Sequence, residues 1–270
     1  MRKNRLKSIL FFLLFILFLY IIREQTYEYG KEDLFMVAYI IVAIIAYLIG
    51  SVNFGVLISK KMAGFDVREK GSGNAGSTNV LRTVGKKAAA ITLVCDILKG
   101  VVSVLIAVIV GKIVKEISPA ILVELAAFFV ILGHTFPVFF GFKGGKGVAT
   151  SLGVLLLINW KIGLICLVFA LAIMAVTRMV SLGSISAAVL FAVLVIFASD
   201  FRTAFIATFD LSYMIFAVIL AALVIFNHRS NLKRIMNGTE NKLSFKKKEE
   251  SVVAEDNKPE ETKTTSEENK

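Results

Sequence analysis

The sequence predicts an all-α protein, a polytopic integral membrane helix bundle. Hydrophobic residues make up 57% of the 270 residues and charged residues only 19%, whereas soluble domains have roughly 45–50% and about 25%. The apolar residues stand in long blocks, and the mean hydropathy is +0.77. This composition excludes disorder for most of the chain.

The apolar blocks predict eight helices, because a helix that crosses a bilayer needs about 20 apolar residues. The first block, 9–22, follows four basic residues and ends without the small residues of a signal-peptide cleavage site, so we expect an uncleaved anchor within 1–33. Seven further blocks lie at 34–59, 88–110, 119–132, 148–158, 162–177, 182–198 and 213–226. Several are shorter than a full span and are expected to tilt or to extend into the loops.

Basic residues predict the orientation of these spans. The segments 1–7, 59–87, 134–146, 178–181 and 227–248 would share one side and carry 21 Lys and Arg, against 6 in the opposite segments 23–33, 111–118, 159–161 and 199–212. Because cytoplasmic loops are enriched in Lys and Arg, we expect both termini and the basic loops in the cytoplasm. From residue 249 onward the chain is polar, and we expect a disordered cytoplasmic tail within 243–270.

The same composition excludes several kinds of site. The net charge is +11. We expect it to come first from cytoplasmic loops that face anionic lipid, and only second from a basic substrate site. Cys95 and Cys166 lie in apolar blocks and are expected to be small buried hydrophobic residues, not a disulfide framework. With only two histidines in addition, a structural zinc site is not expected.

The first polar loop, 71–87, has the sequence GSGNAGSTNVLRTVGKK. Its glycines match G-x-G-x-x-G, but a dinucleotide site needs a preceding β-strand, and here a membrane span precedes the glycines. Glycine also lets backbone N–H groups approach an anion closely, and an arginine can bind two phosphate oxygens. We therefore expect a phosphate site; the alternative is a glycine-rich turn with a topogenic arginine. The candidate ligands are Ser72, Asn74, Ser77, Thr78, Asn79 and Arg82.

The second polar loop lies within 133–153 and has the sequence GHTFPVFFGFKGGKGVATSLG. The P-loop spacing G-x-x-x-x-G-K-[ST] is absent, so a magnesium-nucleotide site is not supported. A glycine turn with two ammonium groups before a helix start still predicts an anion pocket, formed by Lys143, Gly144, Gly145, Lys146 and Gly147. The alternative is a positive loop with an interfacial belt of phenylalanines, and His134 alone is typical of a structural residue.

The third cluster is split between two segments. Ser181 and Ser184 follow Arg178, and a basic stretch begins after the last span, where His228 and Asn231 share one helix face. The alternative for this cluster is a juxtamembrane patch that holds anionic lipid. Asp96 and Lys99 stand three residues apart inside an apolar span, where a charge must face protein or water.

These motifs resemble those of the bacterial acyl-phosphate-dependent glycerol-3-phosphate acyltransferase family. The resemblance covers about 47–242 and rests on GSGNAGSTNVLR, DILKG, GHTFPVFFGFKGGKGVAT, SLGS and HRSNLKR…GTENK, in this order between apolar blocks. It implies an inner-membrane enzyme that transfers a fatty acyl group from acyl phosphate to the 1-hydroxyl of glycerol 3-phosphate, giving lysophosphatidic acid and phosphate. It also implies a seven-helix core, 34–242, so that the anchor and the tail are extra.

The resemblance and the loop chemistry together select the site residues. We predict catalytic roles for Ser72, Arg82, Lys146, His228 and Asn231. We predict substrate contacts by Asn74, Thr78, Asn79, Lys99, His134, Lys143, Gly144, Gly145, Gly147, Ser181 and Ser184, with Glu240 structural. The partners are acyl phosphate, glycerol 3-phosphate and membrane lipids; no metal, cofactor, nucleic acid or obligatory protein partner is expected.

The sequence leaves the proton acceptor open. No Ser-His-Asp arrangement is evident, so direct attack by the glycerol hydroxyl is expected, with its proton passing to a substrate phosphate oxygen or to His228. In the first case catalysis is mainly positioning and charge stabilisation by Arg82 and Lys146. The alternative function is a transporter or channel for a phosphorylated small anion, although the polar residues gather in loops and not at the membrane midplane.

Overall fold

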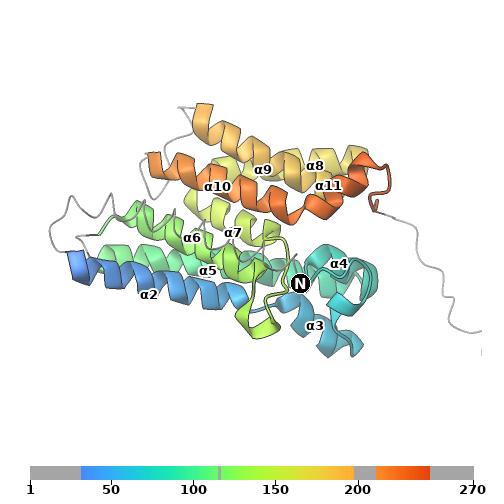
Figure 1. Ribbon diagram of the computed structural model, residues 1–270, viewed down its shortest axis with the longest axis horizontal. Coiled ribbons are helices and arrows are strands. Elements are labelled where there is room, and N and C mark those ends of the chain that lie inside the picture. Colours follow the sequence, from blue (N-terminus) through green and yellow to red (C-terminus); the bar gives the residue numbers. More distant parts are fainter. Residues whose placement is uncertain (1–31, 115–116, 198–210, 244–270) are drawn as a thin grey trace, which may run out of the picture.

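The computed structural model describes residues 32–114, 117–197 and 211–243, and in these ranges the regular secondary structure is entirely helical. The predicted all-α class is confirmed (Figure 1). The elements are α2 (Glu32–Ser51), α3 (Phe54–Ala63), η1 (Val67–Glu69), α4 (Ser77–Thr83), α5 (Lys86–Ile113), α6 (Pro119–Thr135), η2 (Val138–Phe140), α7 (Val148–Ile158), α8 (Trp160–Thr177), α9 (Val180–Phe197), α10 (Leu211–Asn227) and α11 (Arg229–Met236).

The seven predicted helices that fall in the described ranges are present, whereas the number of spans differs from the prediction. Five stretches are long and apolar enough to cross a membrane, and a sixth is possible if α10 and α11, bent by 61°, form one span. α7 has 11 residues and is about 16 Å long, too short to cross a hydrocarbon core of about 30 Å alone. The predicted anchor at 9–22 and the polar tail lie outside the described residues.

The predicted span at 34–59 is present within Met36–Ala63, but it is not one continuous helix, because the chain breaks between α2 and α3. Asn53 caps α3, its side-chain oxygen accepting a hydrogen bond from the Val56 amide at 3.2 Å. On the other side of the break, the Lys99 ammonium donates to the carbonyl oxygens of Gly50 and Val52 at 3.0 and 2.9 Å. A cation at a helix C-terminus satisfies carbonyls that lack an intrahelical partner.

The helices form two groups around α6 and α7. Figure 1 shows α2 and α5 on one side of this pair and α8, α9 and α10 on the other. Fifteen of the 17 residues of α6 are buried, as expected for a helix that is apolar on all sides and lies in the core. The outer helices present large apolar side chains on their exposed faces, which suits contact with lipid.

α2 and α6 pack closely because small residues separate their backbones. A Cβ atom added to Gly133 of α6 would lie 2.2 Å from the carbonyl oxygen of Tyr47 in α2. A Cβ atom added to Gly50 of α2 would likewise lie 2.1 Å from the carbonyl oxygen of Val130 in α6. Helix association in membranes depends on such close van der Waals packing, since lipid removes the hydrophobic driving force.

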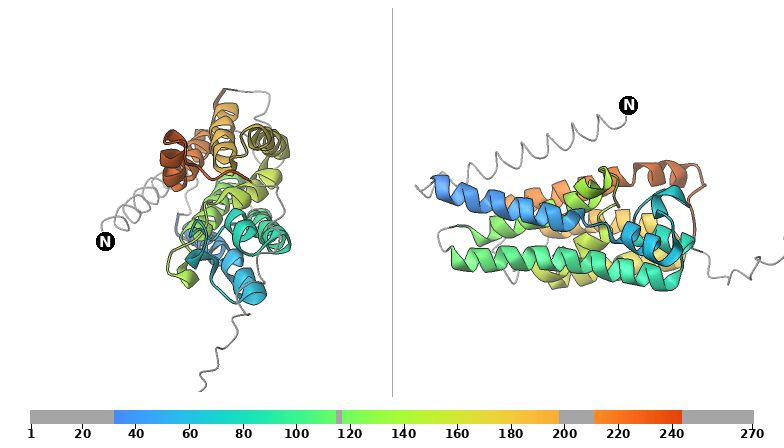
Figure 2. Two further views of the ribbon diagram at one scale, coloured as in Figure 1. Left: turned by 90° about the vertical axis from the view of Figure 1, so that its right-hand side faces the viewer. Right: turned by 90° about the horizontal axis from the view of Figure 1, so that it is seen from below.

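The polar loops gather at one end of the bundle. The segments 52–85, 136–147 and 228–243 and the α8–α9 junction lie together at the end of the bundle marked by α3, α4 and α11 (Figures 1 and 2). Alternating helix direction brings them together, although they are far apart in the sequence. This end therefore collects nearly all the polar residues selected from the sequence.

We expect Gly133→Ala to destabilise the bundle by about 1–3 kcal/mol, the usual cost of overpacking a core. The new methyl group would press on the backbone of α2, which cannot move aside as a flexible side chain would. Thermal unfolding of the purified protein in detergent measures the effect. Ala172→Leu on the exposed face of α8 is the control, and equal unfolding temperatures for both variants would contradict the close-packing argument.

Candidate active site

A single large cavity lies at the loop-bearing end of the bundle. Its volume is about 1540 Å³, and its walls come from the segment 60–96, the loop 134–149, α7 to α11 and the segment 240–243. The mouth is polar and cationic, whereas the walls contributed by α7, α8, α9 and α10 are mainly apolar. The cavity therefore joins an anion-binding region to an apolar arm between the helices.

Fifteen of the sixteen predicted site residues line this cavity. They are Ser72, Asn74, Thr78, Asn79, Arg82, His134, Lys143, Gly144, Gly145, Lys146, Gly147, Ser181, Ser184, His228 and Asn231. Lys99 is the exception and does not line the cavity. Its ammonium lies 2.9 Å from Asp96 and also binds the two carbonyls at the end of α2, so the geometry favours a helix-end contact for Lys99 over the predicted substrate contact.

Glu240 connects the third cluster to the second loop. One of its carboxylate oxygens accepts hydrogen bonds from Ser181 at 2.8 Å and from the side-chain amide of Asn231 at 2.7 Å. The other oxygen forms an ion pair with Arg234 at 2.8 Å. The side-chain oxygen of Asn231 in turn accepts a hydrogen bond from the Lys146 ammonium. Segments from α9, α11 and the α6–α7 loop are thus held in one network.

Several cations surround the Glu240 carboxylate at the cavity mouth. Burial lowers the pKa of Lys146 to about 8; Glu240 opposes this shift, and the cations of Arg234 and Arg82 add to it. Burial also lowers the pKa of Arg82. For Glu240, burial opposes ionisation, but the hydrogen bonds from Asn231, Ser181 and Arg234 together lower its pKa. The site is therefore short of negative charge, which is the condition for binding an anion.

His228 stands at the break between α10 and α11 with a defined tautomer. Its Nδ1 lies 2.8 Å from the carbonyl oxygen of Val224. A carbonyl can only accept a hydrogen bond, so Nδ1 carries the proton and Nε2 is left as an acceptor. Burial, with the nearby Lys146 cation, lowers the pKa of His228 to about 4. The ring is therefore neutral at pH 7 and a weak base.

Asn79 holds the first loop in shape. Its side-chain amide donates to the carbonyls of Val67, Lys70 and Asn74 at 2.9, 3.0 and 2.9 Å. Its side-chain oxygen accepts from the Ser72 amide at 2.8 Å. These bonds occupy its donors and one acceptor position, so the geometry favours a positioning role for Asn79 over a substrate contact. The loop also contains a helix that was not predicted, α4, which carries Arg82 toward the cavity.

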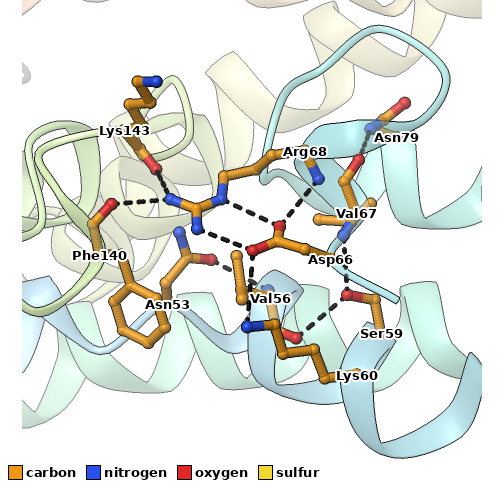
Figure 3. Close-up of polar contacts among 10 residues, drawn as sticks. All are labelled: Asn53, Val56, Ser59, Lys60, Asp66, Val67, Arg68, Asn79, Phe140 and Lys143. Atoms are coloured by element: carbon orange, nitrogen blue, oxygen red, sulfur yellow. Dashed lines mark hydrogen bonds and ion pairs between the residues drawn. The ribbon is translucent and has the colours of Figure 1, made fainter. Parts of the chain in front are cut away.

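Arg68 joins the first loop to the second (Figure 3). Its guanidinium binds both oxygens of Asp66, at 3.0 and 2.7 Å, and donates from Nη1 to the carbonyls of Phe140 and Lys143, at 2.7 and 3.1 Å. These two carbonyls flank Gly141 and Phe142, which both have positive φ. For a residue such as Phe142 that conformation is strained and needs support from its surroundings. Arg68 supplies part of that support immediately before the lysine-glycine loop.

His134, in the last turn of α6, packs against the backbone of the lysine-glycine loop. Its Nδ1 lies 3.4 Å from Asp96, which also pairs with Lys99. A Cβ atom on Gly145 would lie 2.0 Å from His134 Nε2, so only glycine lets the loop backbone lie directly on the imidazole. Asp96 thus serves both the loop and the end of α2, through His134 and Lys99.

Three residues that line the cavity were not selected from the sequence. Arg68 is not among the residues selected from the sequence, although its spacing from Asp66 is a usable signal. Arg234 lies in the basic stretch after the last predicted span and is not selected there either. Ser151 was missed; it is buried, lines the cavity, and its Oγ has no hydrogen-bond partner among the described residues. Its position one turn into α7 and next to the glycine loop was the available signal.

The described residues contain no group of three or more His, Cys, Asp or Glu side chains placed to hold a metal ion. Three of the four carboxylates that line the cavity are instead paired with cations. Asp66 binds Arg68, Asp96 binds Lys99, and Glu240 binds Arg234. The independence of the reaction from metals stays a prediction.

Comparison with known proteins gives a consistent result. A family model described as glycerol-3-phosphate acyltransferase matches residues 40–238. Glycerol-3-phosphate acyltransferase from Clostridioides difficile (strain 630) is 44% identical over 210 residues, covering 78% of this chain and 98% of that protein. The enzyme of the same name from Shouchella clausii is 41% identical over 211 residues, covering 78% and 98%.

Solved structures agree with this result. The crystal structure of PlsY (YgiH), an integral membrane glycerol 3-phosphate acyltransferase, in its glycerol 3-phosphate form matches with a TM-score of 0.67 and 36% identity, over 76% of this chain and 96% of that chain. Its lysophosphatidic acid form matches with a TM-score of 0.64 and 35% identity, over 76% and 95%. The described bundle is thus an integral membrane protein.

We expect Arg68→Lys to lower the free energy of unfolding by about 1–3 kcal/mol, because an ammonium cannot bind Asp66 and both carbonyls in one plane. The pKa of Asp66 is held low, chiefly by its hydrogen bond with Arg68. The contribution is therefore present above the unfolded pKa of about 4 and is lost as the pH falls through the lower folded value. Thermal unfolding in detergent at pH 7 measures the loss.

The control is Arg229→Lys, since among the described residues Arg229 donates only locally, to the carbonyl oxygen of Phe226 at the end of α10. If both variants unfold at the same temperature, Arg68 does not join the loops.

Proposed function

The chain belongs to the glycerol-3-phosphate acyltransferase family, and on this premise we propose that it transfers a fatty acyl group from acyl phosphate to the 1-hydroxyl of sn-glycerol 3-phosphate, giving lysophosphatidic acid and phosphate. The observation that carries the proposal is the two-part cavity. A cationic mouth suits two phosphate groups, and the apolar walls of α7 to α10 suit one alkyl chain. A donor that consists of only a chain and a phosphate matches this division.

The cationic groups are arranged to hold two anions at once. Arg82 reaches the cavity from α4 with a single weak contact, 3.5 Å from the Asn241 carbonyl. Lys146 reaches it from the opposite loop, and Lys143 lies exposed at the rim. Val148 and Ala149, the first residues of α7, also line the cavity, so the positive end of that helix faces the same space. We assign the lysine-glycine loop to one phosphate and Arg82 to the other.

The reaction follows from these positions. The glycerol oxygen forms a bond to the acyl carbon, the bond from that carbon to the phosphate oxygen breaks, and phosphate leaves with the electron pair. The neutral His228 accepts a hydrogen bond from the attacking hydroxyl at Nε2 and orients it. Because the pKa of His228 is about 4, a phosphate oxygen of the substrate is the better proton acceptor. Lys146 stabilises the negative charge that develops on the acyl oxygen or the leaving phosphate.

Positioning accounts for much of the rate in this scheme. Holding two reactants in attack geometry can supply about 7–11 kcal/mol in favourable cases. The network of Glu240 and the bonds of Asn79 and Arg68 fix the groups that hold the substrates. Ser72 and Ser181 add short hydroxyl donors at the cavity wall. No nucleophilic side chain is required, since phosphate is already a good leaving group.

We also propose that the bundle lies in the bacterial inner membrane with the cavity mouth facing the cytoplasm. The loops around the cavity belong to the segments that carry 21 of the Lys and Arg residues, against 6 on the opposite side. In intact cells, an impermeant thiol reagent should label Lys112→Cys and not Thr239→Cys, with Cys95 and Cys166 replaced by alanine. Labelling of position 239 and not of position 112 would show that the cavity mouth faces the outside of the cell.

The alternative function, transport of a phosphorylated anion, is less consistent with the cavity. A transport site lies near the membrane midplane and alternates between two openings. Here the polar groups lie at one end of the bundle, and the cavity continues only as an apolar arm.

The test uses purified protein in detergent with palmitoyl phosphate and glycerol 3-phosphate. We expect phosphate release and lysophosphatidic acid only when both substrates are present, with no loss of turnover on addition of a chelator. Palmitoyl coenzyme A in place of the acyl phosphate should give no product. Product from coenzyme A thioester and none from acyl phosphate would overturn the proposed donor while leaving the acyltransferase assignment intact.

Arg82→Lys should lower kcat/KM by about ten- to hundredfold, the equivalent of 1–3 kcal/mol for a hydrogen bond to a charged group. An ammonium keeps the charge but cannot bind two phosphate oxygens in one plane. Lys86 lines the cavity, so the matched control is Lys87→Arg, which is exposed and does not line it. Equal, small effects in both variants would make Arg82 a topogenic charge and not a ligand.

The pH dependence should follow Lys146. Because its pKa is lowered to about 8, the ammonium is charged below that pH and loses its charge as the pH rises through it. We expect kcat/KM for glycerol 3-phosphate to fall above about pH 8 in the free enzyme. In Lys146→Arg the residual activity should not show this fall, since arginine keeps its charge. A wild-type profile that is flat from pH 7 to about pH 10 would contradict this role.

A further inference from the structure

The apolar arm of the cavity stops partway along each of the four helices that line it. The innermost lining residues are Leu155 of α7, Cys166 of α8, Phe191 of α9 and Leu220 of α10. Phe191 is ten residues, or about 15 Å, along α9 from Ser181 at the mouth. That depth is half of a hydrocarbon core of about 30 Å, the distance that an acyl chain covers in one leaflet.

Packed side chains close the arm below this level. The next inward residues along these helices are Ile158, Ile162, Val195 and Phe216, and each is nearly or fully buried. None of them lines the cavity. The arm is therefore a pocket with a floor.

Phe191 is the largest of the four innermost lining side chains and packs against two other rings. It is 2% exposed. Its ring makes edge-on contacts with Tyr213 and Phe216 of α10, with centroid distances of 6.2 and 6.5 Å. Aromatic rings favour such edge-on pairing. An alkyl chain that reached Phe191 would meet a ring that cannot turn aside without losing both contacts.

We propose that Phe191 sets the longest acyl chain that the enzyme uses efficiently, by closing the far end of the acyl arm. The inference rests on the proposed function, because it needs the donor's chain to occupy this arm. Chains that end above the ring gain apolar contact with each added methylene. Longer chains must bend, or displace the ring from Tyr213 and Phe216.

The cavity also has partly exposed lining residues between α5 and α8, which offer the acyl chain a second path. Leu93 of α5 and Leu171 of α8 line the cavity and are 41% and 54% exposed. Both lie closer to the mouth than Phe191 does, so this opening suits entry of the donor from the lipid. If the chain instead stayed in the side opening, its length would not be sensed by Phe191.

The experiment measures kcat/KM for a series of saturated acyl phosphates from 10 to 20 carbons, in wild type, Phe191→Leu and Phe191→Ala. The readout is the ratio of long-chain to short-chain kcat/KM within each protein, because this ratio is independent of the folded fraction. We expect about a tenfold rise in the ratio for Phe191→Ala and a smaller rise for Phe191→Leu, since one methylene in an apolar pocket is worth roughly tenfold or more.

Two further variants test the opposite shift in chain length and control for the loss of a buried ring. Ala187 lines the arm one turn nearer the mouth, and Ala187→Leu should move the preference toward shorter chains. Phe128→Leu is the matched control, because Phe128 is equally buried and pairs edge-on with Phe129, yet does not line the cavity. Its chain-length ratio should equal that of wild type.

The outcomes separate this inference from the proposed function. Unchanged ratios in the Phe191 and Ala187 variants, with normal turnover of acyl phosphates, would overturn the role of Phe191 and place the chain in the side opening. If no acyl phosphate is used but another acyl donor is, the proposed donor fails. The same ratios measured with that donor would still decide whether Phe191 limits chain length.

Discussion

The hydrogen bonding of one carboxylate, Glu240, is the interaction on which the site depends. It lies beyond the last helix, yet it binds Ser181 of α9 and both Asn231 and Arg234 of α11. Through Asn231 it also fixes Lys146. Without this negative charge, the cations of Arg82, Lys146 and Arg234 would face one another across a partly buried space. Glu240 thus lets a strongly positive site form while keeping its members in place for an anionic substrate.

The membrane setting explains why Asp96 and Lys99, the charges within the bundle, are paired. A charge inside the bilayer is costly unless it faces a partner or water. Asp96 pairs with Lys99, and Lys99 in turn satisfies the free carbonyls where α2 ends. Asp66 and Arg68 form the equivalent pair nearer the surface and hold the second loop by its carbonyls. Each pair also contacts a loop or a helix end. The same contacts therefore neutralise charge and hold the loops in place.

The division of the cavity follows from where each helix begins and ends. α7 starts at the lysine-glycine loop and stops after 11 residues, so its first turn lines the cationic mouth of the cavity and its later turns line the apolar arm. α8 begins beside that end, at Trp160, and buried side chains of all four helices, Ile158, Ile162, Val195 and Phe216, close the arm. The short central helix α7 therefore lines both parts of the cavity.

The sequence by itself determined the class of the protein and selected most of the candidate residues that the fold brings to one cavity. Apolar blocks of nearly the right length located the seven helices in the described ranges, because burying backbone in lipid leaves few other structures. Loop residues such as Arg82, Lys146 and His228 stood out because polar side chains are conspicuous beside apolar spans.

Only the tertiary structure decided what these residues touch. The break at Asn53, the short α7, the assignment of Lys99 to a helix end, and the roles of Arg68 and Ser151 depend on contacts between segments 40 to 90 residues apart. Composition and local spacing carry no information about such contacts. Whether a cation binds substrate or a carbonyl depends on which backbone the fold brings within about 3 Å of it, and that is a property of packing and not of sequence order.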